Sequence, residues 1–125
     1  AMAWRIYPFP EIEPMEKAAQ LLLQHRNFES FCRSHHDAGT TLCEIREVAW
    51  EQKDHVLEFH IEADRFLRNM VRALVGTLVQ IGQGKYPPEH LQQVLEAKDR
   101  RAAGPSAPAH GLCLEKVGYP EGWLD

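Results

Sequence analysis

Three arginines lie at helical intervals in the stretch ADRFLRNMVRALVG, which covers residues 63–76. Arg65, Arg68 and Arg72 are separated by three and four positions, and residues with that spacing share one face of an α-helix. A guanidinium group binds phosphate or carboxylate through a planar fork of N–H donors. The pattern therefore indicates an anion site. On these residues alone, a solvated basic face that pairs with Glu62 or Asp64 is the simpler interpretation.

The apolar residues around these arginines predict a helix from about Phe66 to Ile81. Their spacing is that of a helix with one buried face, and they are Phe66, Leu67, Met70, Val71, Leu74, Val75, Leu78 and Ile81. Gly82 and Gly84 are expected to end the helix. A further sector is small or polar, which suits the close approach of another backbone, and it consists of Asn69, Ala73, Gly76 and Thr77.

The segments before this helix predict one more helix and a hairpin. Pro14 suits the start of a helix, and the inner face of that helix should be Met15, Ala18, Ala19, Leu22 and Leu23. Asn27 suits the cap of a short turn that points Phe28 and Phe31 inward. Residues 40–50 and 54–64 alternate between apolar and polar types, so they predict two antiparallel strands joined at 51–54, with the glutamates on the wet face.

The segments after the main helix complete an α+β domain. Residues 87–101 predict a helix whose inner face is Leu91, Val94 and Leu95. The small residues at 102–111 predict a loop that crosses the surface, and 112–119 alternate as a strand does. We therefore expect an antiparallel sheet with helices packed on one face.

Composition limits the class of protein. The chain has 125 residues and a net charge of −4, which disfavours a free-standing, strongly basic nucleic-acid binder but allows a local basic patch. The three cysteines form no CxxC pair, which is typical of reduced thiols in the cytoplasm. No apolar run is long enough to span a membrane, and the start shows no secretory signal, so no membrane association is expected.

Several spaced motifs resemble the C-terminal half of TruA-type tRNA pseudouridine synthases. Those proteins carry a Phe-(Leu/Val)-x-x-Met-Val-Arg helix start, which is matched here by Phe66 and by Met70 to Arg72. They continue with a glycine matched by Gly76, an Ala-Lys-Asp-Arg run matched by 97–100, a Gly-Leu-x-Leu strand matched by 111–114, and a final tyrosine matched by Tyr119. Upstream, MEKAAQLLLQHRNFESFC resembles the family's Met-x-x-Ala-Ala helix, with Asn27 in place of the usual aspartate.

The resemblance implies an enzyme domain that acts on tRNA, typically on uridines of the anticodon stem-loop, without a cofactor. It implies that Arg72 pairs with the catalytic aspartate and that Leu112 lies in the pocket for the flipped uracil. Arg65, Arg68 and His110 are candidates for RNA contact; a loop histidine in solvent is the simpler interpretation of His110. The family's enzymes work as dimers, so a homodimer of the full-length protein is expected.

The family's catalytic aspartate lies in an Arg-Thr-Asp-x-Gly-Val-His motif, and this chain has no such motif. We therefore interpret residues 14–125 as the C-terminal domain of a pseudouridine synthase, half of that fold, which is inactive without its N-terminal catalytic half. Residues 1–13 would be an interdomain arm or linker remnant. The apolar stretch at 4–10 fits either a segment that packed on a preceding domain or an ordered N-terminal arm.

Other functions and sites compete with this interpretation. The main alternative is an RNA-binding module without catalysis, and a further one is a helix-on-sheet interaction domain. Cys32, His35 and His36 suggest a metal site, with Cys43 or Asp37 as the remaining ligand, but their spacing matches no common zinc pattern. Buried thiols, surface histidines and no metal are the expected arrangement.

Overall fold

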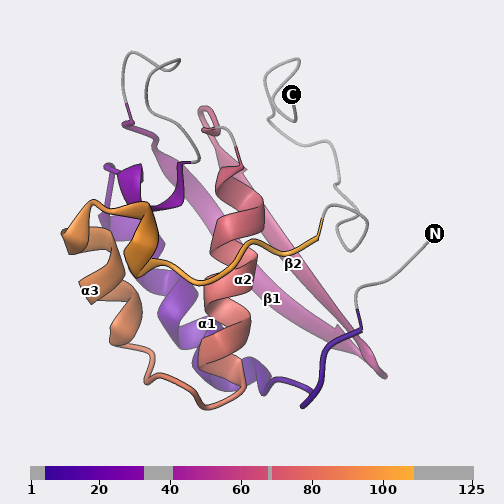
Figure 1. Cartoon of the computed structure of the whole chain (residues 1–125). Coiled ribbons are helices and arrows are strands. Elements are labelled where there is room, and N and C mark those ends of the chain that lie inside the picture. The colour runs from indigo at the N-terminus through magenta and orange to yellow at the C-terminus, as the bar shows by residue number, and fades with distance from the viewer. Residues whose placement is uncertain (1–4, 33–40, 68, 109–125) are drawn as a thin grey trace.

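The computed structural model describes residues 5–32, 41–67 and 69–108. An antiparallel hairpin of β1 (Ile45–Lys53) and β2 (Val56–Ala63) carries the helices on one side (Figure 1). These helices are α1 (Ile12–Gln20), α2 (Met70–Gly82) and α3 (His90–Ala97). Short 3₁₀ turns cover η1 (Leu21–Gln24), η2 (Glu29–Phe31) and η3 (Arg100–Ala102). The expected α+β class is confirmed. The expected strand at 112–119 lies outside the described residues.

The hairpin has the predicted partners but a different turn. Lys53 pairs with Val56, so the connection is Asp54-His55, and Asp54 takes a left-handed φ of 55°. The expected connection at 51–54 was wrong because 51–53 are paired strand residues. A bulge between Ile45 and Glu47 changes which positions face inward, so that Ile45 and Val48 are both buried.

The main helix begins later than its apolar pattern predicts. Asn69 has a φ of 67°, in the left-handed region, and a residue in that conformation cannot continue a right-handed helix. Phe66 and Leu67 are nevertheless buried, which is why the pattern extended the helix to them. At the other end, α2 stops at Gly82 and Gly84 has a φ of 82°, as the two glycines predicted. No helix in the described ranges is long and apolar enough to cross a bilayer.

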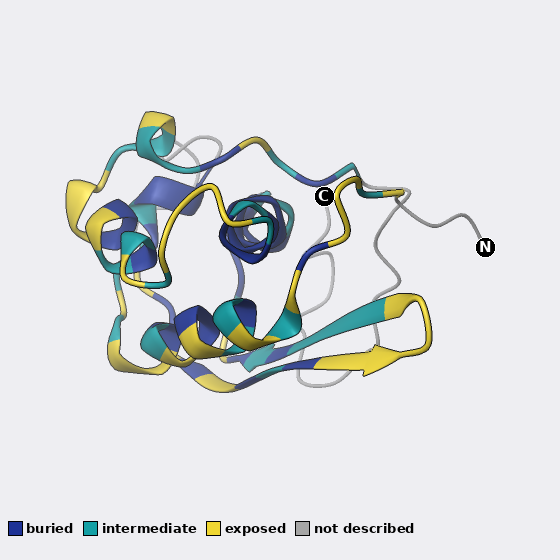
Figure 2. Cartoon of the chain, turned by 90° about the horizontal axis from the view of Figure 1, so that it is seen from below, coloured by how far each residue is buried: buried dark blue, intermediate teal, exposed yellow. Residues whose placement is uncertain are grey.

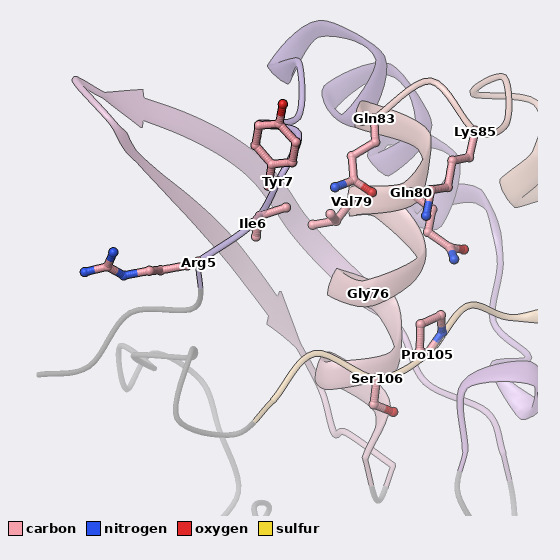
Figure 3. Close-up of a pocket in the computed structure, with 10 residues that line it drawn as sticks. All are labelled: Arg5, Ile6, Tyr7, Gly76, Val79, Gln80, Gln83, Lys85, Pro105 and Ser106. Carbon is pink, nitrogen blue, oxygen red and sulfur yellow. The ribbon is translucent and has the colours of Figure 1, made fainter.

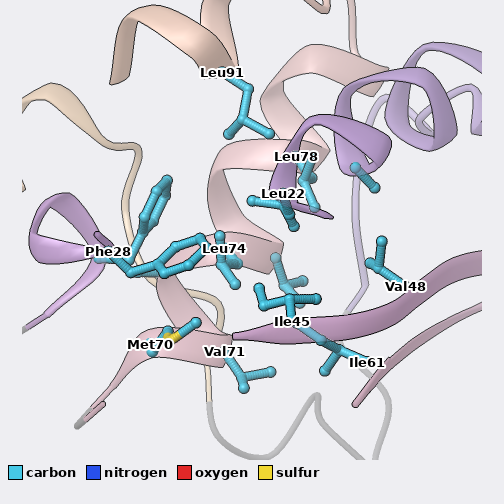
Figure 4. Close-up of a cluster of buried hydrophobic side chains, with 14 of the residues drawn as sticks. Leu22, Phe28, Ile45, Val48, Ile61, Met70, Val71, Leu74, Leu78 and Leu91 are labelled. Carbon is cyan, nitrogen blue, oxygen red and sulfur yellow. The ribbon is translucent and has the colours of Figure 1, made fainter. Parts of the chain in front are cut away.

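The core lies between the hairpin and the helices. Phe28, Leu74 and Leu78 are fully buried there, and Ile45 and Ile61 of the hairpin face the same cluster (Figure 4). Seen along its axis, α2 is buried on almost every side (Figure 2). The predicted inner face of α1 holds except at its end. Leu22 is buried, but Leu23 is 41% exposed because the chain has tightened into η1 by then.

Helix α3 ends earlier than expected, and the segment after it turns back toward α2. Lys98 takes a φ of 52° and ends α3, so residues 98–101, which were predicted to be helical, lie outside that helix. The hydroxyl of Ser30 fixes this corner, since it donates to the Val94 carbonyl at 2.6 Å and accepts from the Asp99 amide at 2.9 Å.

Residues 104–107, here called the crossing segment, run across α2 (Figure 1). A Cβ atom at Gly76 would overlap the carbonyl oxygen of Pro105, so the glycine allows backbone to lie directly on the helix. Gly104 and Ala107 are buried, so the expected surface loop is instead packed in this region. The small sector of the helix does receive another backbone, as predicted, and that backbone belongs to the same chain.

Replacing Gly76 with alanine tests this packing. We expect Gly76→Ala to lower the free energy of unfolding by roughly 2–3 kcal/mol, because the new methyl group would push the crossing segment off α2. Gly84→Ala is the matched control. Its Cβ would meet no atom within 4 Å, so its cost should be only the left-handed backbone strain of about 1 kcal/mol. Equal losses in urea denaturation would contradict the packing.

Candidate active-site face

Arg72 lies in the first turn of α2, half-buried beside the crossing segment. Its Nε donates a 2.7 Å hydrogen bond to the carbonyl of Ala107, and the Ala107 amide donates to the Arg72 carbonyl at 2.9 Å. The two residues therefore hold each other through both backbone and side chain. Within the described ranges, neither terminal nitrogen of Arg72 has a carboxylate or hydrogen-bond partner. Among the residues that the structure describes, none occupies that edge of the guanidinium, which can bind an anion.

Three side chains that the sequence did not single out as site residues hold the crossing segment beside Arg72. The hydroxyl oxygen of Ser106 accepts from Asn69 Nδ2 at 2.7 Å and from Arg100 Nη2 at 2.9 Å. Arg100 also donates through Nη1 to the Gly104 carbonyl at 3.0 Å. Arg100 belongs to the Ala-Lys-Asp-Arg run, but the sequence of that run does not predict which segment Arg100 binds.

A buried threonine fixes the other end of the crossing segment. Thr77 Oγ1 accepts from the Gly104 amide at 2.9 Å and donates to the Ala73 carbonyl at 2.8 Å. The Gly104 amide and the Thr77 hydroxyl therefore both have defined partners, which favours a single arrangement of this end of the segment. Together with Arg72, the side chains of Asn69, Thr77 and Arg100 fix the crossing segment on α2.

Arg65 and Arg72 do not share the helix face that their spacing predicted. Arg65 precedes α2 and donates through Nη1 to the Leu42 carbonyl at 3.1 Å, whereas Arg72 binds the crossing segment. The expectation failed because the left-handed Asn69 interrupts the helical spacing between them. Arg68, His110 and Leu112, the other site residues predicted from the sequence, lie outside the described residues.

The described aspartates are engaged away from Arg72. Asp64 accepts from the Glu44 amide at 2.8 Å, and Asp54 forms the hairpin turn. Asp99 binds Arg101 at 2.9 Å, and the hydrogen bonds from Arg101 lower the pKa of its carboxyl group. A carboxylate partner for Arg72 is thus not supplied by residues 5–32, 41–67 or 69–108.

A shallow hollow of about 230 Å³ lies next to the crossing segment. Residues 5–11 are here called the N-terminal arm. The start of this arm forms one wall of the hollow, and Val79, Gln80 and Pro105 contribute to the others (Figure 3). The arm is tied to α2, because the Glu11 amide donates to the Gly82 carbonyl at 2.9 Å and Gln83 Nε2 donates to the Pro8 carbonyl at 3.0 Å. Tyr7 is 95% exposed, so the arm is bound at one end and presents an aromatic ring at the other.

The cysteines of the suggested metal site are buried as free thiols. Burial raises the pKa of the Cys43 thiol to about 11, so this sulfur is protonated at neutral pH. His35 and His36 lie outside the described residues. In the described ranges, one group has metal-ligand atoms close together, namely Glu51, Glu58 and His60 on the hairpin. His60 Nε2 lies 3.1 Å from a Glu51 carboxylate oxygen and 3.5 Å from one of Glu58 on a partly exposed surface, an arrangement that is common without a metal ion.

The raised pKa of Cys43 predicts a dependence of stability on alkaline pH. The folded chain keeps this thiol protonated while the unfolded chain loses the proton, so stability is complete below the unfolded pKa of 9.0 and decreases up to about pH 11. The free energy of unfolding, measured by urea denaturation from pH 8 to 11, should fall more steeply in the protein than in Cys43→Ala. Parallel curves would contradict the prediction.

Comparisons with known proteins point to one family. The family model for tRNA pseudouridine synthase matches residues 18–120. The tRNA pseudouridine synthase A of Syntrophomonas wolfei is 47% identical over 89% of this chain and 45% of its own length. The protein of the same name from Parabacteroides distasonis is 44% identical over 93% of this chain and 47% of its own length.

A third relative has the same relation to the chain. The tRNA pseudouridine synthase A of Bacteroides thetaiotaomicron is 45% identical over 94% of this chain and 45% of its own length. The chain therefore spans about half the length of the curated relatives that it matches. The match includes Arg72, the crossing segment and the helices that hold them. The chain belongs to the tRNA pseudouridine synthase family.

Proposed function

We propose that the chain is the C-terminal half of an enzyme that isomerises uridine to pseudouridine in tRNA, in the anticodon stem-loop. The family match supports the reaction class, and the length of the relatives supports a further half that completes the site. The observation that carries the proposal is the held guanidinium of Arg72. Its Nε is fixed on Ala107 while its terminal nitrogens have no described partner.

Arg72 has a defined chemical task under this proposal. The reaction detaches uracil from ribose and rejoins it through carbon, so a catalytic carboxylate must stay ionised beside the sugar and base. A neighbouring guanidinium favours the charged form of a carboxylate and lowers its pKa. We propose that Arg72 provides that charge to an aspartate of the N-terminal half, and that Leu112 packs beside the flipped uracil.

The remaining proposed contacts concern the RNA and the assembly. Arg65, Arg68 and His110 are proposed to contact tRNA, and the full-length protein is proposed to be a cytoplasmic homodimer that needs no cofactor. The net charge of −4 is compatible with RNA binding, because only the surface that faces the phosphates must be positive. The buried free thiols are compatible with a reducing compartment.

Reconstitution from two halves tests the proposal. This chain should be mixed with its separately expressed N-terminal half, and pseudouridine should be assayed in an unmodified tRNA transcript. We expect activity from the mixture and none from either half. Arg72→Ala should lower the activity by at least about 100-fold, because it removes a charge aimed at the reacting carboxylate.

The controls separate catalysis from folding. Arg101→Ala removes a cation that pairs with Asp99 at the surface, and it should leave the activity near that of the unchanged mixture. Pseudouridine formation by this chain alone would contradict the half-enzyme proposal. Activity that survives Arg72→Ala would remove Arg72 from the site.

The alternative function is an RNA-binding module without catalysis. An inactive full-length protein that still binds tRNA at low salt would favour this alternative over isomerisation. A protein with no RNA affinity even at low salt would instead be an interaction domain. Binding and activity should therefore be measured on the same preparation.

A further inference from the structure

We propose that Ser106, held by Asn69 and Arg100, is a positioning residue that sets the orientation of the Arg72 guanidinium and makes it receive its carboxylate partner end-on. The inference rests on the proposed function and adds to it a set of side chains and a pairing geometry. It follows from hydrogen bonds within α2, η3 and the crossing segment, all of which the structure describes.

The geometry of Arg72 limits how an anion can bind. A guanidinium can meet a carboxylate along the side that includes Nε or across the end formed by Nη1 and Nη2. Nε of Arg72 already donates to the Ala107 carbonyl at 2.7 Å. The side approach would therefore break a short hydrogen bond, whereas the end approach leaves it intact. The structure thus favours pairing through Nη1 and Nη2.

Ser106 controls this arrangement because it directly precedes Ala107. Its hydroxyl oxygen accepts two hydrogen bonds, from Asn69 on the N-terminal side of α2 and from Arg100 in η3. A hydroxyl offers two acceptor positions, so both are in use. The two donors come from different elements, and together they fix the backbone that presents the Ala107 carbonyl to Arg72.

Asn69 joins this network to the start of α2. Its left-handed backbone, with a φ of 67°, directly precedes α2, and its side-chain amide donates to the Ser106 hydroxyl. Asparagine is among the residues that tolerate this conformation, and its side chain supplies the required donor. One residue therefore both begins the helix that carries Arg72 and anchors the segment that orients it.

Three variants of the full-length protein isolate this effect. Ser106→Ala removes the acceptor, and Ser106→Thr keeps it. Asn69→Gly permits the left-handed backbone but removes the donor. Arg101→Ala is the matched control, because Arg101 follows Arg100 in η3 but binds Asp99 rather than the crossing segment.

The first readout is independent of activity. Hydrogen exchange of the Arg72 Nε–H group should be slow by NMR in the protein and in Ser106→Thr. It should become about tenfold faster in Ser106→Ala and Asn69→Gly, because the carbonyl acceptor is no longer held in place. Arg101→Ala should not change it. Exchange in the unchanged protein as fast as that of a solvent-exposed arginine would overturn the inference.

The second readout is the pH profile of pseudouridine formation. A poorly oriented Arg72 lowers the carboxylate pKa less, so the acid limb of kcat/KM should move to higher pH by about half a unit in Ser106→Ala and Asn69→Gly. Their kcat should fall about tenfold through misplacement, with KM for tRNA unchanged. Ser106→Thr should restore the profile.

Each combination of results decides between the two proposals. Slow Nε–H exchange that depends on Ser106, in a full-length protein that forms no pseudouridine, would reject the proposed function and leave the positioning network in place. An active protein in which Ser106→Ala changes neither the exchange nor the acid limb would overturn the positioning role. A lower kcat without a shift of the acid limb would also overturn it, because such a loss reflects structure alone.

Discussion

The contact between the crossing segment and α2 is the constraint on which the candidate site depends. Backbone lies on backbone there, which is possible because Gly76 has no side chain to occupy the space of the Pro105 carbonyl. The two hydrogen bonds between Arg72 and Ala107 then align α2 with the crossing segment. Without this contact, the Arg72 guanidinium would lose the acceptor that holds its Nε.

The core and the corner at Ser30 position the two elements that make this contact. The buried cluster around Leu74 and Leu78 fixes α2 on the hairpin and on α1. Ser30 ties the end of α3 to the turn that leads into η3, and so places Arg100 where it can bind Gly104 and Ser106. The core thus positions the corner at Ser30. That corner positions the crossing segment through Arg100, and the crossing segment holds the Arg72 guanidinium.

The described residues orient Arg72 without help from a second domain, as the proposed half of an active site would require. Arg72 is oriented by its own domain through neutral backbone and hydroxyl groups, so its positive charge is not consumed by an internal carboxylate among the described residues. A partner carboxylate would then meet a cation that is already in place, and less conformational freedom would be lost on pairing. The observed hydrogen bonds of Arg72 are therefore compatible with the proposed function.

The sequence predicted the parts of the fold that repeat and missed those that depend on single residues. Apolar spacing identified α2, α3 and the hairpin, and the small sector containing Gly76 correctly indicated a close backbone contact. Arg65 and Arg72 were wrongly expected on one helix face, because spacing cannot reveal the left-handed Asn69 between them. The bulge after Ile45 was missed for a similar reason, since alternation is compatible with either register. Ser106 was missed because its role comes from donors far apart in the chain.

The most direct test of the central claim is a crystal structure of the full-length protein. The measured quantity is the distance from the terminal nitrogens of Arg72 to the nearest carboxylate oxygens of the N-terminal half. The account predicts an aspartate bound end-on at about 2.7–2.9 Å, with the Nε bond to Ala107 retained. A guanidinium that faces solvent, or one that has left Ala107 to bind a carboxylate through Nε, would contradict it.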